Sequence, residues 1–197
     1  MNLLIQLPVL LFSIILHEIA HGYVAKILGD DTADKAGRLT LNPIPHLDMF
    51  GSVVLPLLLV LSQSSIVLGW AKPVPVNYHK LRDPKRDMIW VSLAGILTNI
   101  ALALICSFIF RNTRIELLQT ICVYGVLYNI FLATFNLIPI PPLDGSRVVS
   151  GMLPPQQAYQ YNKIEPYGIM VIFLLLYLGM FRYILGFIRP VFKLLLG

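Results

Sequence analysis

The sequence predicts an all-α polytopic membrane protein. Of its 197 residues, 57% are hydrophobic and only 13% are charged, whereas about a quarter of the residues in a soluble domain are charged. The hydrophobic residues form runs of about 20, the length that a helix needs to cross a bilayer. These figures exclude a disordered chain and argue against a water-soluble globule. We therefore expect a single membrane-embedded domain over residues 1–197.

Five apolar segments are predicted to enter the membrane. Four of them are long enough to span it as helices, at about residues 3–28, 88–110, 115–138 and 167–188. The fifth, at about residues 50–70, contains Pro56 and the polar stretch Ser62–Ser65. It is therefore predicted to be re-entrant, dipping into the bilayer and returning to the same side.

Shorter segments between the apolar runs are predicted to be extended. Gly37–Pro43 alternates in polarity and ends at a proline, and Trp70–Asn77 has prolines at positions 73 and 75. Because proline allows edge strands at most, we expect short β segments in a small irregular sheet. The tail Arg189–Leu194 is expected to lie at the membrane interface as an amphipathic piece.

His17, Glu18 and His21 carry the sharpest chemical signal in the chain. Residues four apart share a helix face, so His17 and His21 can bind one metal ion, with Glu18 placed to polarise a bound water. These groups follow 16 residues without a charged side chain. Burying them in a membrane costs several kcal/mol unless they pair, bind a metal or face water. This cost favours a functional site over a pair of hydrogen-bonded structural histidines.

Asp144 is the candidate for a third metal ligand, because a catalytic zinc has three protein ligands and one open position. It ends the stretch Asn136–Asp144, in which three prolines between residues 139 and 142 prevent a regular helix. Unwound backbone at membrane depth is tolerated only where it is buried in protein or lines a wet cavity. A simple Asp-Gly turn is the alternative, but the histidine pair favours a site with one Zn²⁺ per chain.

Topology provides a test of this ligand set. The histidines lie in the second half of the first helix and Asp144 lies just past the third, so they meet only if these two helices run in the same direction. That requires residues 50–70 to be re-entrant. It also places ten of the fifteen Lys and Arg residues on one side, as the positive-inside rule expects for the cytoplasm. These ten are Lys26, Lys35, Arg38, Lys72, Lys80, Arg82, Lys85, Arg86, Arg147 and Lys163.

Three blocks of the sequence resemble the site-2 protease family of intramembrane zinc metalloproteases (M50-type): His17–His21, Ala94–Asn99 and Asn136–Gly145. In the middle block, Ile96 stands where the family usually has proline. The length resembles that of compact, core-only members without PDZ or CBS domains. The resemblance implies that His17, His21 and Asp144 hold zinc and that Glu18 is the general base.

The resemblance also implies substrates that are themselves transmembrane helices, cut within or near the bilayer. Such a helix must unwind before its carbonyl groups can be attacked, and the extended segments at residues 37–42 and 74–77 are suited to hold it by edge pairing.

Four further polar residues have two interpretations each. Asn99, Asn129 and Asn136 lie in apolar runs, where asparagines usually form hydrogen bonds between helices. The alternative is contact with substrate or with the developing oxyanion, which we favour for Asn136 because it belongs to the third block. His46 is either a loop residue or a rival metal ligand.

We therefore expect a zinc metalloendopeptidase that acts in regulated intramembrane proteolysis, in the cell membrane, with its active site toward the cytoplasmic side. The expected partners are the lipid bilayer, transmembrane protein substrates, and a second copy of the chain or a regulatory membrane protein. Nucleic acid is not expected, because the net charge of +5 lies in short loops. The alternatives are a zinc-binding pseudoprotease, which would not need Glu18, and a small metal-ion transporter, which would need a polar path across the membrane.

Overall fold

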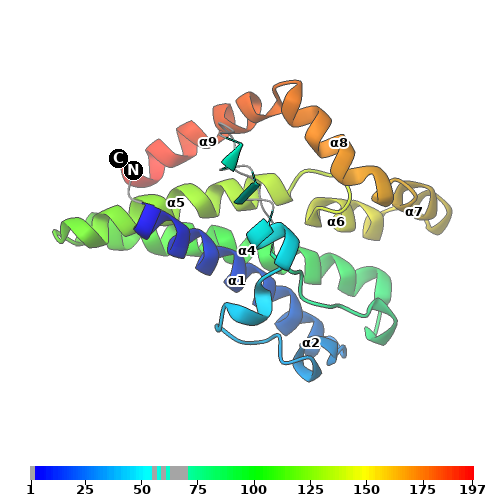
Figure 1. Cartoon of the computed structure of the whole chain (residues 1–197). Helices are drawn as coiled ribbons and strands as arrows, with labels where there is room; N and C mark the ends of the chain where they lie inside the picture. The colour runs from blue at the N-terminus through cyan, green and yellow to red at the C-terminus, as the bar shows by residue number, and fades with distance from the viewer. Residues whose placement is uncertain (1–2, 55–56, 59–60, 63–70) are drawn as a thin grey trace.

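The computed structural model describes residues 3–54, 57–58, 61–62 and 71–197, which form helices joined by irregular segments (Figure 1). Among these residues there is no β-strand, so the predicted small sheet is not confirmed. In chain order the elements are α1 (Leu3–Ile27), α2 (Thr32–Lys35), η1 (Ile44–His46), η2 (Met49–Val54), η3 (Tyr78–Lys80), α4 (Pro84–Asn112), α5 (Glu116–Asn136), α6 (Asp144–Met152), α7 (Pro155–Asn162), α8 (Glu165–Tyr177) and α9 (Met180–Leu196).

Three helices, α1, α4 and α5, are long and apolar enough to cross a membrane. They agree with the first, second and third spanning helices predicted from the sequence to within four residues at each end. Asp83 begins α4 by accepting a hydrogen bond from the N–H of Arg86, and Pro84 occupies the first turn, where no N–H is needed.

Contacts between side chains fix the directions of these three helices. Near the start of α1, Gln6 contacts Tyr124 on α5, and further along α1, Ser13 contacts Asn129. The numbers rise together, so α1 and α5 run in the same direction. The order is reversed for α4. The earlier α1 residues Ser13 and His17 contact Asn99, and the later α1 residue His21 contacts Val91, which comes before Asn99 on α4. Helix α4 is therefore antiparallel to both.

This arrangement has a consequence for the segment between α1 and α4. Helix α1 ends and α4 begins at the same end of the bundle, so the intervening residues 28–83 return to the side that they leave. That is the condition under which the two halves of the predicted metal site can meet. The re-entrant segment predicted at about residues 50–70 lies largely outside the described residues; of its described part, residues 50–54 belong to the short π-helix η2.

The predicted helix at 167–188 is wrong as a single element. It consists of α8 and α9, whose axes differ by 77°. Helix α8 ends at Tyr177, and Gly179 then has a φ of 95°, in the left-handed region that glycine adopts without steric cost. The bent pair counts as at most one further span, which gives three or four candidate spans within the described part of the chain.

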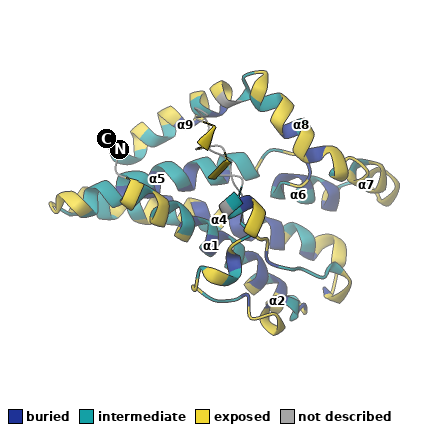
Figure 2. Ribbon diagram, in the orientation of Figure 1, coloured by how far each residue is buried: buried dark blue, intermediate teal, exposed yellow. Residues whose placement is uncertain are grey.

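The two sides of α5 are covered by different helices. Helix α1 lies on one side, while α9 packs on the other through Ile184 and Ile188, which are buried against Ala103, Val126 and Ile130 (Figure 1). The carbonyl groups at the end of α9 accept hydrogen bonds from Arg111 and Ser107 of α4. Figure 2 shows the buried residues concentrated where α1, α4 and α6 meet, which is the end of the bundle that carries His21.

Candidate metal centre

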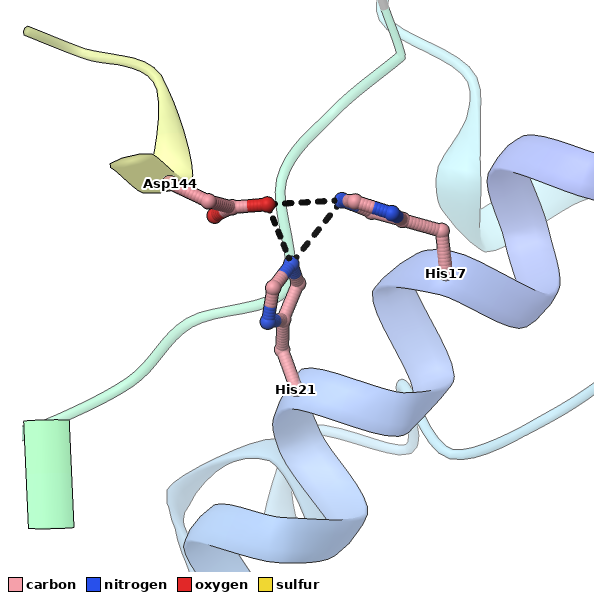
Figure 3. A group of neighbouring side chains, drawn as sticks. All are labelled: His17, His21 and Asp144. Atoms are coloured by element: carbon pink, nitrogen blue, oxygen red, sulfur yellow. Dashed lines mark hydrogen bonds and ion pairs between the residues drawn. The ribbon is translucent and has the colours of Figure 1, made fainter. Parts of the chain in front are cut away.

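Two histidines of α1 and the aspartate at the start of α6 converge on one point (Figure 3). The Nε2 atoms of His17 and His21 are 2.9 Å apart, and they lie 3.1 and 3.3 Å from Oδ2 of Asp144. Both histidines are buried. Residues four apart share one face of α1, which is why the two imidazoles lie side by side. Within the described residues, these three side chains form a group able to hold a metal ion.

The other ring nitrogen of each histidine is held by a neighbouring helix. Nδ1 of His21 lies 2.7 Å from the backbone carbonyl oxygen of Val91, and Nδ1 of His17 lies 2.6 Å from Oδ1 of Asn99. A carbonyl oxygen can only accept a hydrogen bond, so each Nδ1 carries the proton. In the neutral imidazoles, each Nε2 therefore presents a bare lone pair toward Asp144. This is the tautomer that binds a metal through Nε2.

Behind His17 lies a chain of buried amides. Asn99 donates from Nδ2 to Oδ1 of Asn129 at 2.7 Å and to the Ser13 carbonyl oxygen at 3.4 Å. Asn129 donates in turn to the Ser13 hydroxyl at 2.9 Å and to the Gly125 carbonyl oxygen at 2.8 Å. Asn99 is fully buried and Asn129 nearly so. The network joins α1, α4 and α5 and fixes the orientation of the His17 ring.

Asp144 owes its position to the end of α5. Helix α5 stops at Asn136, the prolines prevent it from continuing, and Asp144 begins α6, where the helix dipole favours a carboxylate. A Cβ on Gly145 would collide with the backbone carbonyl of Leu137, so this turn requires glycine.

The geometry fits a zinc ion. Ligand atoms bound about 2.0–2.1 Å from a tetrahedral ion lie about 3.3–3.4 Å from one another, close to the observed separations of 2.9, 3.1 and 3.3 Å. Oδ2 of Asp144 is buried and receives no hydrogen bond from the described residues. Two facing lone pairs and a carboxylate oxygen repel one another unless a cation lies between them.

Gly95 of α4 brings this helix against the two imidazoles. A Cβ at this position would lie 2.5 Å from Cε1 of His17 and 2.5 Å from Nε2 of His21. Real Cβ atoms essentially never approach so closely, so only glycine leaves the rings where they are. Gly95 lies in the middle block of the resemblance, but no pattern in the residues predicts that it lies against the histidines.

Glu18 lies one residue beyond His17 and is half-buried. Its Oε2 accepts a hydrogen bond of 2.6 Å from the backbone N–H of Val74, which belongs to the irregular segment between residues 71 and 77. Neither this contact nor the Val91 carbonyl was found from the sequence, because a backbone group leaves no signal in residue types.

The remaining candidate residues lie elsewhere. Asn136 is the last residue of α5 and is half-buried. His46 is fully buried, with Nε2 2.8 Å from the Thr40 carbonyl oxygen, and does not belong to the group that His17, His21 and Asp144 form. The structure thus brings together the three predicted ligands, and it places Asn99 and Asn129 in a buried network behind them.

Known proteins share this chain's sequence over most of its length. Residues 111–179 match peptidase family M50. The "Putative zinc metalloprotease YwhC" of Bacillus subtilis (strain 168) is 37% identical over 186 residues, 89% of this chain and 81% of the relative. The "Putative zinc metalloprotease Rip2" of Mycolicibacterium smegmatis is 28% identical over 170 residues, 84% of this chain and 64% of the relative. No solved structure matches the chain.

A more distant relative, "Zinc metalloprotease MJ0392" of Methanocaldococcus jannaschii, is 26% identical over 153 residues, 77% of this chain and 35% of the relative. Together with the apolar helices and the buried ligand group, these relatives, which are named as zinc metalloproteases, define the class: a membrane-embedded metalloprotease. The chain belongs to peptidase family M50, the site-2 protease family, which confirms the resemblance found in the sequence.

Proposed function

We propose that this protein is an intramembrane zinc endopeptidase in which His17, His21 and Asp144 hold the metal and Glu18 is the general base. The observation that carries the proposal is the convergence of two Nε2 atoms and one carboxylate oxygen beside the candidate membrane spans. The fixed tautomers support it further, because each Nδ1–H is already committed to an oxygen on α4.

A zinc ion held there supplies Lewis acidity, which lowers the pKa of a water molecule and polarises the scissile carbonyl. The protein's own part is to place a base beside that water. Glu18 directly follows His17 on α1 and is not one of the three grouped ligands. Its carboxylate takes a proton from the attacking water and passes it to the nitrogen of the leaving amine. Asp144 adds negative charge to the ligand set.

The proposed substrates are transmembrane segments, cut within or near the bilayer. Helix α1, which carries both histidines, is a candidate span, so a substrate must approach from the membrane region. A hydrogen-bonded helix hides its carbonyl groups, so the segment must unwind locally before Glu18 can act on it. We assign Asn136, half-buried at the end of α5, to contact with the substrate. Asn99 and Asn129 orient His17.

The proposed topology is a single domain of the cell membrane with the metal centre toward the cytoplasm. The return of residues 28–83 to the side that they leave supports a re-entrant segment at about residues 50–70, which the distribution of Lys and Arg favours. The excess of Lys and Arg on the side of the metal centre supports the orientation. A fourth span would be the bent pair α8 and α9.

The first prediction tests the proposal with Glu18→Gln, which keeps the shape of the side chain and removes the base. The purified protein is placed in liposomes with a panel of single-pass membrane segments, and cleavage is followed by mass spectrometry. We expect wild type to cut at least one segment, and Glu18→Gln to hold one zinc per chain by elemental analysis while losing cleavage at least about 1,000-fold.

Glu116→Gln, the same change at an exposed position at the start of α5, is the matched control and should leave cleavage intact. Retained turnover in Glu18→Gln would exclude Glu18 as the base. A wild-type protein that contains zinc and cuts soluble peptides but no membrane segment would contradict the proposed substrate class.

A further inference from the structure

An irregular segment crosses α1 beside the metal centre, over the face that carries Glu18 and Gly22. The backbone N–H of Val74 donates to Oε2 of Glu18 at 2.6 Å. Four residues further along α1, a Cβ on Gly22 would lie 2.8 Å from Cγ1 of Val74. Because residues 18 and 22 share a helix face, the absence of a side chain at Gly22 lets the segment approach closely enough for the Glu18 contact. Val74 is buried.

The segment is held on both sides of Val74. On one side, the Arg38 guanidinium donates to the Lys72 carbonyl oxygen at 2.7 Å, and the Lys72 N–H donates to the His46 carbonyl oxygen at 2.9 Å. On the other side, the Asn77 N–H donates to Oδ2 of Asp30 at 2.6 Å, and Asp30 is fully buried. The Val74 N–H therefore lies on a backbone that is fixed on each side by buried groups.

Proline flanks Val74 on both sides, at positions 73 and 75. A proline fixes its own φ, lacks an N–H, and restricts the residue before it to an extended conformation. Val74 therefore carries the only amide proton of this tripeptide, in a backbone that is stiff before Glu18 contacts it. A hydrogen bond from an N–H to a carboxylate is also stronger than one between neutral groups.

We propose that the Val74 backbone N–H is a positioning group for Glu18. It holds Oε2 and so fixes the rotamer of the side chain, which leaves Oε1 to exchange protons with the attacking water. This inference rests on the proposed role of Glu18 as the base. It implies that a segment 56 residues further along the chain places the base, while α4 and α6 complete the metal site.

Hydrogen exchange tests the contact without any activity. Because neither proline has an amide proton, two proteolytic fragments with the same start that end at Pro73 and at Pro75 differ by the Val74 amide alone. We expect exchange at Val74 to become about 10–100-fold faster in Glu18→Ala than in wild type. Equal exchange in the two proteins would show that the hydrogen bond does not form, and would overturn the inference.

Kinetics test the positioning role with two variants at the same position. Val74→Pro removes the N–H, whereas Val74→Ala keeps it and also loses the valine side chain. With a transmembrane segment that wild type cleaves, we expect kcat for Val74→Pro to lie about 10–100-fold below that for Val74→Ala, with similar KM and one zinc per chain in both. Equal kcat would overturn the inference, as would a kcat that rises in Val74→Pro or a change confined to KM.

Should Val74→Pro fail to fold or to hold zinc, an ester analogue in which the α-hydroxy acid of valine replaces Val74 removes the N–H with less steric change, and the same kcat comparison applies. Glu18→Gln separates the proposed role of Glu18 as the base from the proposed role of the Val74 N–H. If Glu18→Gln loses cleavage and removal of the Val74 N–H does not, the base assignment stands and the positioning role fails. If Glu18→Gln keeps cleavage, the proposed function itself fails.

Discussion

The inner helices α1, α4 and α5 and the outer pair α8 and α9 both pack through apolar faces. Among the side chains that the structure describes, those of the inner group include polar residues that are buried and hydrogen-bonded between its helices. There, His17, Asn99 and Asn129 are buried and hydrogen-bonded across three helices. The described part of α9 instead buries Ile184 and Ile188. In Figure 2 the buried residues gather where the inner helices meet, whereas exposed and intermediate residues predominate along α8 and α9.

Polar contacts join the outer pair to the rest of the molecule at its two ends. At the start of α8, Glu165 forms an ion pair with Arg147 of α6, and at the end of α9, Arg111 donates to two carbonyl groups. The difference teaches where precision is needed. A metal site requires its ligands to be held within fractions of an ångström. Helices α8 and α9 carry none of the three grouped side chains and need no such precision.

Gly95→Ala should give the largest effect, because the added Cβ would lie 2.5 Å from atoms of both imidazoles. We expect zinc affinity to fall at least about 100-fold, measured by competition with a chelator. Gly186→Ala makes the same change in α9, where a Cβ meets nothing within 4 Å. It should leave zinc binding unchanged and stabilise the helix by up to about 1 kcal/mol. Full zinc affinity in Gly95→Ala would show that zinc binding does not depend on the close packing of α4 against the two imidazoles.

Asn99→Ala should give the next largest effect. It leaves Nδ1 of His17 without its acceptor while Nε2 and the other ligands remain, so we expect a loss of zinc affinity of about 10–100-fold. Asn112→Ala, at the exposed end of the same helix, is the control. If the two variants bind zinc equally well, the buried amide network does not support the site.

Arg111→Ala tests the outer region. It removes the hydrogen bonds to the Leu194 and Leu195 carbonyl groups at the end of α9. We expect the free energy of unfolding in detergent to fall by about 1 kcal/mol, with zinc content unchanged. Arg114→Ala, an exposed arginine in the loop between α4 and α5, serves for comparison. Loss of zinc in Arg111→Ala would mean that α9 also holds the metal site.

Asp31→Asn should give the smallest effect, which is a change in how the stability of the protein depends on pH. Hydrogen bonds from Lys35 and Lys80 lower the pKa of Asp31 from 3.8 to about 2. Because the folded protein holds the carboxylate ionised at lower pH than the unfolded chain does, the contribution to stability is complete above about pH 4 and is lost as the pH falls toward 2. The difference in unfolding temperature between wild type and Asp31→Asn should narrow over that range. A constant difference would exclude the ion pairs as its cause.

Much of this molecule could be predicted from its sequence, because the strongest signals are local. Apolar runs gave α1, α4 and α5, and the four-residue spacing of His17 and His21 placed both imidazoles on one face. Asp144 was predicted to lie beside the histidines on the condition that α1 and α5 run in the same direction. The metal role of these residues remains a prediction, whereas their proximity is now a structural fact.

What the sequence did not give depends on contacts between distant residues or on backbone geometry. The run at 167–188 reads as continuous because its break at Gly179 lies between two apolar stretches. The contact of Glu18 with Val74, and of His21 with Val91, involve backbone groups that every residue shares. The two interpretations of Asn99 differ only in what surrounds the side chain.

The amide network behind His17 also sets an order of events during synthesis. The chain makes both histidines with α1, but the acceptor for His17 arrives with α4, the support for that acceptor with α5, and the carboxylate only with α6. A nascent chain that has completed α1 alone therefore lacks both the acceptor for His17 and the third proposed ligand. The proposed ligand set is complete only once residue 144 has been synthesised and α1, α4 and α6 have packed together.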